Sequence, residues 1–301
     1  GGDFTTAPEI SQMFGELIGL WAAHAWQAMG APARFRLVEF GPGRGTLMAD
    51  MLRATRIVPG FHAALSVHLV ETSPVLRGRQ ATALKGFEPV WHDTVAGALD
   101  GPVIAVANEF LDALPLDQFV MTPEGWRERL VGLDDDGDLA FGVSAAGGGT
   151  LKITAPVGTV LEQPSIALDI VAQLAGHLAS AGGAAMKRHE FVAPLAEPGE
   201  ADLTVHVDFE RMGQAALKAG AALHGPATQR DFLLALGLPQ RAQALSLKAD
   251  ATQRTAISAA FDRLIETGET GMGDLFKVLA LSQRNLPPLP GFDLHRLPDR
   301  G

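Results

Sequence analysis

Three glycines, Gly41, Gly43 and Gly45, alternate with other residues, and the acidic residue Glu39 precedes them. Glycine tolerates positive φ angles and, without a Cβ, lets the backbone approach a ligand closely. The apolar spacing that follows predicts a helix, whose first N–H groups have no partner within the helix. An acid beside such a loop suits a positively charged ligand better than a pyrophosphate. The stretch therefore predicts a strand, a ligand-binding glycine loop and a helix.

The glycine spacing separates two classes of ligand. A dinucleotide-binding loop has the pattern G-x-G-x-x-G, in which the third glycine packs the helix on the strand. Here the pattern is G-x-G-x-G, and Thr46 stands where that third glycine is expected. This spacing disfavours an enzyme of the NAD type. A glycine-rich turn without any ligand is the remaining alternative.

Polar residues recur where later strands are predicted to end. Glu71 and Thr72 follow the second strand, Asp93 follows the third, and Asn108 and Glu109 follow the fourth. Open α/β sheets bind ligands at the carboxyl ends of their strands, where an acid can accept both hydroxyls of a ribose. We predict this role for Glu71, with a surface acid leading into a helix as the alternative. Asp93 is suited to the amino group of an adenine.

Composition limits the class of protein. The chain has 301 residues, of which 47% are hydrophobic and 19% charged, as expected for a folded domain. Its formal net charge of −10, without a basic cluster, argues against nucleic-acid binding and is compatible with a cationic substrate. The sequence contains no cysteine and no apolar run long enough to span a membrane. We expect an intracellular protein without membrane insertion.

The predicted elements alternate between strands and helices, which indicates a doubly wound α/β fold in one domain, 1–301. A β-rich insertion is expected at 115–150 and a helical insertion at 227–268. The expected helices are 10–29, 75–84 and 161–178, and the expected strands are 35–40, 64–71, 87–93, 101–107 and 275–281.

The junction between Met186 and Lys187 interrupts this pattern. Another core strand is expected here, but only Ala184 to Met186 is apolar before a charged run begins. We interpret this as too short for a strand and its loop. The sequence therefore predicts that further residues belong between Met186 and Lys187.

Several motifs together resemble the MidA family of S-adenosylmethionine-dependent methyltransferases, which includes a mitochondrial complex I assembly factor that methylates a protein arginine. The resemblance spans nearly the whole chain and implies a seven-stranded Rossmann-like sheet with S-adenosylmethionine as cofactor. The motifs are Asp3 to Gly15, Glu39 to Thr46, Val70 to Pro74, Asn108 to Pro115 and Asp202 to Phe209. The cofactor residues implied are Glu39, Gly41, Gly43, Gly45, Glu71, Thr72, Asp93 and Asn108.

The resemblance also implies a protein substrate of the respiratory complex subunit type. The expected location is the bacterial cytoplasm or, in a eukaryote, the mitochondrial matrix. An arginine acceptor needs carboxylates that orient its guanidinium group. The candidates are Glu109, Asn108 and Asp112 for catalysis, and Thr6, Glu9, His206 and Asp208 for substrate binding. Capping roles are the alternatives for Glu109 and Asp112. His206 and Asp208 lack a third ligand at metal spacing, so no metal is expected.

The resemblance leaves an alternative function open. An assembly factor that binds its partner through the inserted segments would keep the same fold with a vestigial methyltransferase site.

Overall fold

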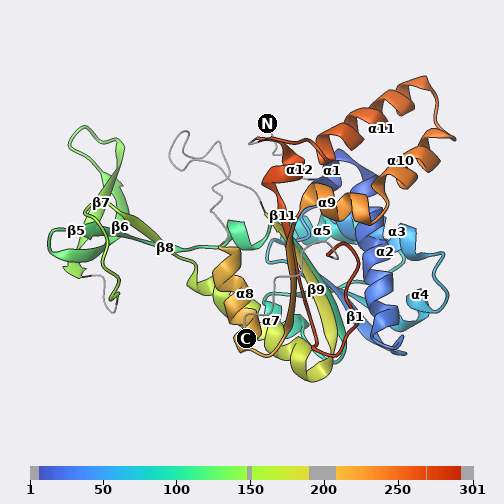
Figure 1. Ribbon diagram of the computed structural model, residues 1–301, viewed down its shortest axis with the longest axis horizontal. Helices are drawn as coiled ribbons and strands as arrows, with labels where there is room; N and C mark the ends of the chain where they lie inside the picture. Colours follow the sequence, from blue (N-terminus) through green and yellow to red (C-terminus); the bar gives the residue numbers. More distant parts are fainter. Residues whose placement is uncertain (1–6, 148–150, 190–207, 269, 293–301) are drawn as a thin grey trace.

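The computed structural model describes residues 7–147, 151–189, 208–268 and 270–292 (Figure 1). Seven strands form one sheet in the order β10-β11-β9-β4-β1-β2-β3. Neighbouring strands from β9 to β3 are parallel, whereas β11 runs antiparallel to β9 and β10. The predicted seven-stranded α/β fold is therefore confirmed. The strands are β1 (Phe35–Phe40), β2 (Leu65–Val70), β3 (Val90–His92), β4 (Val103–Asn108), β9 (Gly183–His189), β10 (Ala222–Thr228) and β11 (Lys277–Ser282).

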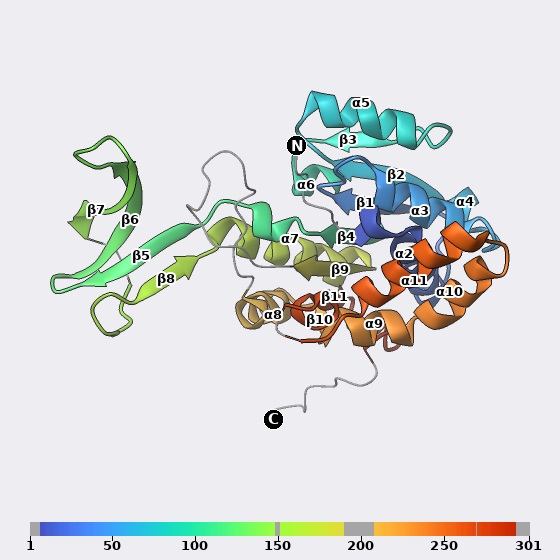
Figure 2. The same ribbon diagram turned by 90° about the horizontal axis from the view of Figure 1, so that it is seen from above.

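Helices cover both faces of this sheet (Figure 2). Leu37 and Ile104 belong to the core on the α2 and α3 face, and Val38 and Ala105 belong to the core on the α7 and α8 face. Because alternate residues are buried on opposite faces, the central strands have unbroken apolar sequences. The helices are α1 (Ala7–Ile10), α2 (Gln12–Ala28), α3 (Thr46–Thr55), α4 (Phe61–Ala64), α5 (Pro74–Ala83), α6 (Val95–Ala98), α7 (Ser165–Ala181), α8 (Phe209–Lys218), α9 (Gln229–Ala235), α10 (Leu238–Ser246), α11 (Ala251–Leu264) and α12 (Met272–Leu275), with a 3-10 turn, η1 (Leu111–Ala113).

The first predicted helix is divided at Ser11. Ser11 has an extended backbone, and its hydroxyl accepts a hydrogen bond from the backbone N–H of Met13 at 3.2 Å. This is the geometry of an N-cap, which satisfies a donor at the start of α2. The apolar spacing continues through the break, so periodicity alone does not reveal it.

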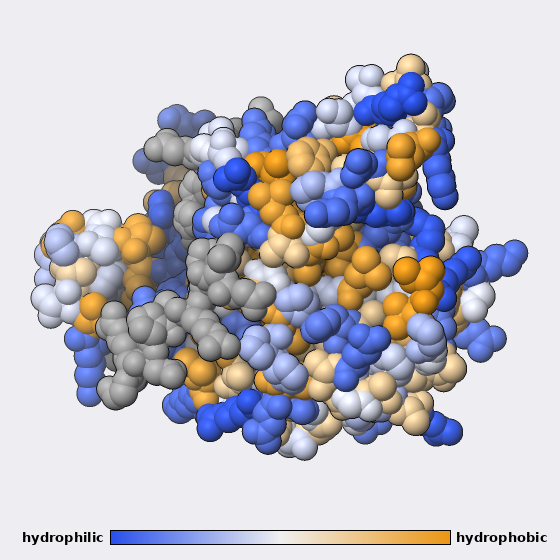
Figure 3. Space-filling view, turned by 45° about the vertical axis from the view of Figure 1, so that its right-hand side comes forward, coloured by the Kyte–Doolittle hydropathy of each residue, from blue (hydrophilic) through white to orange (hydrophobic). Residues whose placement is uncertain are grey.

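The β-rich insertion forms a separate four-stranded sheet, which we call the arm. It projects from one end of the molecule and forms the left-hand lobe in the space-filling view (Figures 1 and 3). Its order is β7-β6-β5-β8, with β5 (Asp117–Thr122), β6 (Gly125–Leu133), β7 (Leu139–Gly147) and β8 (Val160–Gln163). The helix expected from residue 161 begins only at Ser165. Pro164 directly precedes α7, and the residues before it form β8, which pairs with β5. The insertion consequently extends beyond residue 150.

The interpretation that the chain around Met186 is too short for a strand was wrong. β9 runs without a break through the junction, with Met186 opposite Val106 and Lys187 opposite Ala107 of β4. Lys187 is only 7% exposed, and burial lowers the pKa of its ammonium group to about 7. A charged run is typical of a strand end, but the first residue of this run, Lys187, lies inside the sheet. Whether further residues belong at this junction stays a prediction.

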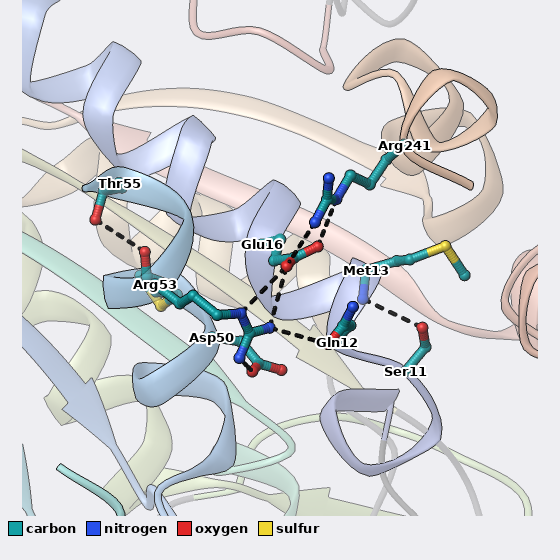
Figure 4. Close-up of polar contacts among 9 residues, drawn as sticks. Ser11, Gln12, Met13, Glu16, Asp50, Arg53, Thr55 and Arg241 are labelled. Carbon is teal, nitrogen blue, oxygen red and sulfur yellow. Dashed lines mark hydrogen bonds and ion pairs between the residues drawn. The ribbon is translucent and has the colours of Figure 1, made fainter. Parts of the chain in front are cut away.

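The helical insertion is anchored to α2 and α3 by the buried carboxylate of Glu16 in α2 (Figure 4). Its side chain is 4% exposed and accepts hydrogen bonds from Arg241 of α10 at 2.6 and 2.9 Å. Arg53 of α3 donates to the same carboxylate at 3.1 Å and pairs with Asp50 at 2.6 Å. A carboxylate is tolerated at such burial because two guanidinium groups compensate its charge.

We predict that Glu16→Gln destabilises the protein by about 2 kcal/mol, because it removes the anion shared by two arginines. Urea unfolding measures the change. The control is Asp100→Asn. Asp100 forms an ion pair of similar length, 2.6 Å, with Arg36, but its side chain is 77% exposed. An exposed pair of this kind contributes less than about 1 kcal/mol. Equal effects of the two substitutions would contradict the anchoring role.

Candidate active site

The strand register brings the predicted site residues to one edge of the sheet. Phe40, the last residue of β1, lies opposite Val70 of β2 and Ala107 of β4, and Val70 lies opposite His92 of β3. The residues that follow these strands therefore meet at the carboxyl edge, where open α/β sheets bind ligands.

The glycine loop between β1 and α3 has the backbone that its sequence predicts. The φ angles of Gly41, Gly43 and Gly45 are +63°, +52° and +84°. A Cβ at Gly41 would approach the Phe110 ring to 2.8 Å, so this glycine permits close packing of the loop on the segment after β4. A Cβ at Gly43 would meet no described atom within 4 Å. Gly43 therefore borders open space in which a ligand can approach the backbone.

Glu39 lies at the base of this loop and is only 3% exposed. The backbone N–H of Met48 hydrogen-bonds to its carboxyl group, but Oε2 has no hydrogen-bond partner in the part of the chain that the structure describes. Burial raises the pKa of Glu39 to about 8. A buried acid is costly without a compensating cation or donor. Its position therefore fits a ligand that carries a positive charge.

Glu71 is connected to the glycine loop through Gln80, a residue that sequence reasoning missed. Oε1 of Glu71 accepts a hydrogen bond from the backbone N–H of Ser73 at 2.8 Å. The side-chain amide of Gln80 donates to Oε2 of Glu71 at 3.2 Å and to the carbonyl of Gly43 at 2.8 Å. Gln80 is fully buried and accepts from the indole of Trp91 at 2.8 Å. Gln80 stands between Leu76 and Leu84 at helical spacing, and a polar residue within such a series was the available signal.

Thr72 and Asp93 lie at the exposed rim of the same edge. The Asp93 side chain is 81% exposed and pairs with Arg77 at 2.6 Å. Arg77 also donates to the backbone carbonyl of Glu71 at 2.8 Å, so it connects the ends of β2 and β3. The adenine-binding role of Asp93 stays a prediction.

Asn108 and Glu109 follow directly at the end of β4. The amide of Asn108 donates to Oε1 of Glu109 at 3.4 Å. Glu109 has a φ of +50°, as few non-glycine residues do. Ala31 and Glu88 also have positive φ, but they precede β1 and β3 at the opposite edge of the sheet. Backbone strain of this kind is often concentrated at functional sites.

Asp112, one of the predicted catalytic residues, is buried behind the end of β4. It lies in η1, is 2% exposed, and its charge counteracts the lowered pKa of Lys187. The catalytic role of Asp112 stays a prediction.

The predicted substrate-binding residues are described only in part, because Thr6 and His206 lie outside the described residues. Glu9 of α1 pairs with Arg44 of the glycine loop at 3.5 Å, which places α1 beside the site. Asp208 caps α8 by accepting from the N–H of Arg211 at 2.9 Å. Within the described ranges, no group of three or more His, Cys, Asp or Glu side chains could hold a metal ion.

Comparisons with known proteins agree with this geometry. A family model described as "Putative S-adenosyl-L-methionine-dependent methyltransferase" matches residues 17–186 and 172–227. The chain is 35% identical to the mitochondrial protein arginine methyltransferase NDUFAF7 of Danio rerio, covering 93% of this chain and 76% of the relative. The chain is 32% identical to human NDUFAF7, and the alignment covers 93% of this chain and 73% of the human protein. A Burkholderia thailandensis protein solved with bound S-adenosyl-homocysteine superimposes on the chain with a TM-score of 0.80 and 29% sequence identity. The superposition covers 96% of this chain and 81% of that protein.

The fold and the site define a methyltransferase that depends on S-adenosyl-L-methionine. More particularly, the chain belongs to the MidA-like family, to which the mitochondrial protein arginine methyltransferases NDUFAF7 are related. The predicted family, cofactor and enzyme class are thereby confirmed, and the NAD-type alternative falls away.

The comparisons do not support the predicted cytoplasmic location, since the relatives are named as mitochondrial. Among the helices that the structure describes, none is long and apolar enough to cross a membrane.

We predict that Gly43→Val weakens binding of S-adenosyl-homocysteine at least ~100-fold, because the new side chain fills the space beside the loop. Gly101→Val is the matched control. Gly101 has a φ of +61° and equally open surroundings, but it precedes β4 at the opposite edge. Calorimetry should show near-normal affinity for the control. Equal affinities of the two variants would contradict the proposed cofactor position.

Proposed function

We propose that this protein transfers a methyl group from S-adenosyl-L-methionine to an arginine of a partner protein. The observation that carries the proposal is the position of Glu109. Its carboxylate follows β4 at the carboxyl edge of the sheet, and the adjacent Phe110 packs on Gly41 of the glycine loop. The acidic group therefore lies beside the loop that contacts the cofactor. The names of the NDUFAF7 relatives support arginine as the acceptor.

When bound, the cofactor supplies a methyl group attached to a positively charged sulfur. Gly41 and Gly43 allow the loop to approach it, and Glu39 supplies the anion for its ammonium group. The cofactor residues that we propose are Glu39, Gly41, Gly43, Gly45, Glu71, Thr72, Asp93 and Asn108.

Glu109 orients the acceptor guanidinium by accepting two of its N–H groups, as carboxylates commonly bind arginine. A bound cofactor would supply the methyl group in exchange for its bond to sulfur, and Glu109 would hold the acceptor nitrogen in position to receive it. The acceptor nitrogen then loses a proton, for which the carboxylate of Glu109 is a suitable acceptor. Asn108, hydrogen-bonded to Glu109 at 3.4 Å, holds this carboxylate in place. Because alignment is the main requirement of such a displacement, small shifts of Glu109 should be costly.

We further propose that the partner is a subunit of a respiratory complex, as the family resemblance implies. The net charge of −10 favours approach of a basic protein segment. Glu9 beside the glycine loop is the described candidate for contacting that segment, with Thr6 and His206 as further candidates. The mitochondrial names of the relatives support a location in the mitochondrial matrix.

We predict that Glu109→Gln reduces methyl transfer to a protein arginine at least ~100-fold, about 2.7 kcal/mol of transition-state stabilisation. The substitution keeps size and hydrogen bonding but removes the charge. Affinity for S-adenosyl-homocysteine should change little. The assay measures incorporation of labelled methyl groups into candidate proteins, with mass spectrometry of the modified residue.

Glu88→Gln is the matched control, because Glu88 is also a glutamate with positive φ, +46°, but lies outside the carboxyl edge. Methyl transfer by Glu109→Gln at the wild-type rate would exclude Glu109 as the arginine clamp. A wild-type protein that binds the cofactor but modifies no protein would favour the assembly-factor alternative.

A further inference from the structure

A single buried glutamine connects three of the segments that form the carboxyl edge. Gln80 lies in α5 and is fully buried. Its side-chain nitrogen donates to the carbonyl of Gly43 at 2.8 Å and to Oε2 of Glu71 at 3.2 Å, and its oxygen accepts from the indole of Trp91 at 2.8 Å. A buried amide is costly unless it is hydrogen-bonded, and this one has a partner for both N–H groups and for its oxygen.

These partners allow only one orientation of the amide. In the reversed orientation, the oxygen of Gln80 would face the Gly43 carbonyl and the Glu71 carboxylate, which only accept hydrogen bonds. The nitrogen would face the indole N–H of Trp91, which only donates. Trp91 therefore helps to fix the direction in which Gln80 presents its two donors.

The glycine loop also packs directly on Gln80. Gly45 has a φ of +84° and lies at the start of α3. A Cβ at Gly45 would lie 3.4 Å from both Cα and Cγ of Gln80 and 3.5 Å from the Cβ of Ala83. The loop thus contacts α5 through a hydrogen bond at Gly43 and through packing at Gly45. Gln80 consequently sets the position of the glycine loop relative to the end of β2.

The Glu71 carboxylate is held at both of its oxygens. Oε1 accepts from the backbone N–H of Ser73 at 2.8 Å, and Oε2 accepts from Gln80. Each carboxylate oxygen can accept a second hydrogen bond, so a carboxylate fixed in this way can still receive both hydroxyls of a ribose. Glu71 is partly exposed, so a ligand can reach it.

We propose that Gln80 is a positioning residue for ribose recognition, which holds the Glu71 carboxylate in a fixed orientation relative to the glycine loop. Because Gln80 is fully buried, it acts through Glu71 and Gly43. A carboxylate that is already oriented loses less side-chain entropy when the ligand binds. This inference rests on the proposed ribose role of Glu71 and does not depend on the identity of the methyl acceptor.

Calorimetry with S-adenosyl-homocysteine and its 2′-deoxy analogue tests the proposal. The wild-type protein should bind S-adenosyl-homocysteine at least ~10-fold more tightly, since the analogue lacks one of the hydroxyls that Glu71 accepts. Gln80→Leu should reduce this preference to less than ~3-fold, because the carboxylate loses its fixed orientation. A glutamine that only packs in the core would weaken both ligands equally. An unchanged preference in Gln80→Leu would therefore overturn the proposal.

Gln229→Leu is the matched control. Gln229 is also fully buried, and its side-chain amide donates to the carbonyl of Leu264 at 2.7 Å. It follows β10, at the other end of the strand order from β3, so its loss should lower stability without changing the preference. An equal loss of preference in this control would contradict the specific role of Gln80. Where Gln80→Leu does not fold, Gln80→Asn, which withdraws the amide by one methylene, carries the same expectation.

A double-mutant cycle tests whether Gln80 acts through Glu71. Glu71→Ala alone should abolish the preference, and adding Gln80→Leu should change it no further. A Glu71→Ala protein that retains a preference and loses it when Gln80 is also replaced would overturn the positioning role. A wild-type protein without any preference would overturn this inference together with the ribose role of Glu71. Methyl transfer to arginine is measured separately, through Glu109→Gln.

Discussion

The site depends on a carboxylate that the sheet holds away from water and leaves incompletely compensated. Glu39 belongs to the same face of β1 as Leu37, and among the residues that the structure describes only the N–H of Met48 is identified as a hydrogen-bond donor to it. Because its folded-state pKa of about 8 lies above the ordinary value of 4.5, the empty protein loses stability as pH rises through this interval. A bound cation would reverse that loss. Cofactor binding and folding stability are therefore linked at this residue.

The surrounding architecture connects the glycine loop to the segment after β4 that carries Glu109. Phe110 packs on Gly41, so the end of β4 and the start of the glycine loop are fixed relative to each other. Gln80 links the loop to Glu71, and Arg44 links it to Glu9. Each connection joins segments from different strands at one edge. Precise positioning of this kind is what an in-line displacement requires.

Local patterns predicted the sheet and most of the candidate site. The glycine spacing and the polar residues after apolar runs are short-range signals, and they located Glu39, Glu71 and Glu109 at one edge. The errors arose where tertiary packing overrides local pattern. Lys187 is charged yet lies inside β9, and the helical spacing from residue 161 includes β8. The bond between Glu16 and Arg241 joins residues 225 positions apart, which no spacing rule anticipates.

The most direct test of this account is the number of protons released when S-adenosyl-homocysteine binds. At about pH 6.5 a carboxyl group with a pKa near 8 is protonated, and the ligand's ammonium group would displace that proton. Calorimetry in buffers of different ionisation enthalpy should therefore show release of about one proton by the wild type. Glu39→Gln should release none. Binding by the wild type without proton release, or equal release by the variant, would contradict the central role of Glu39.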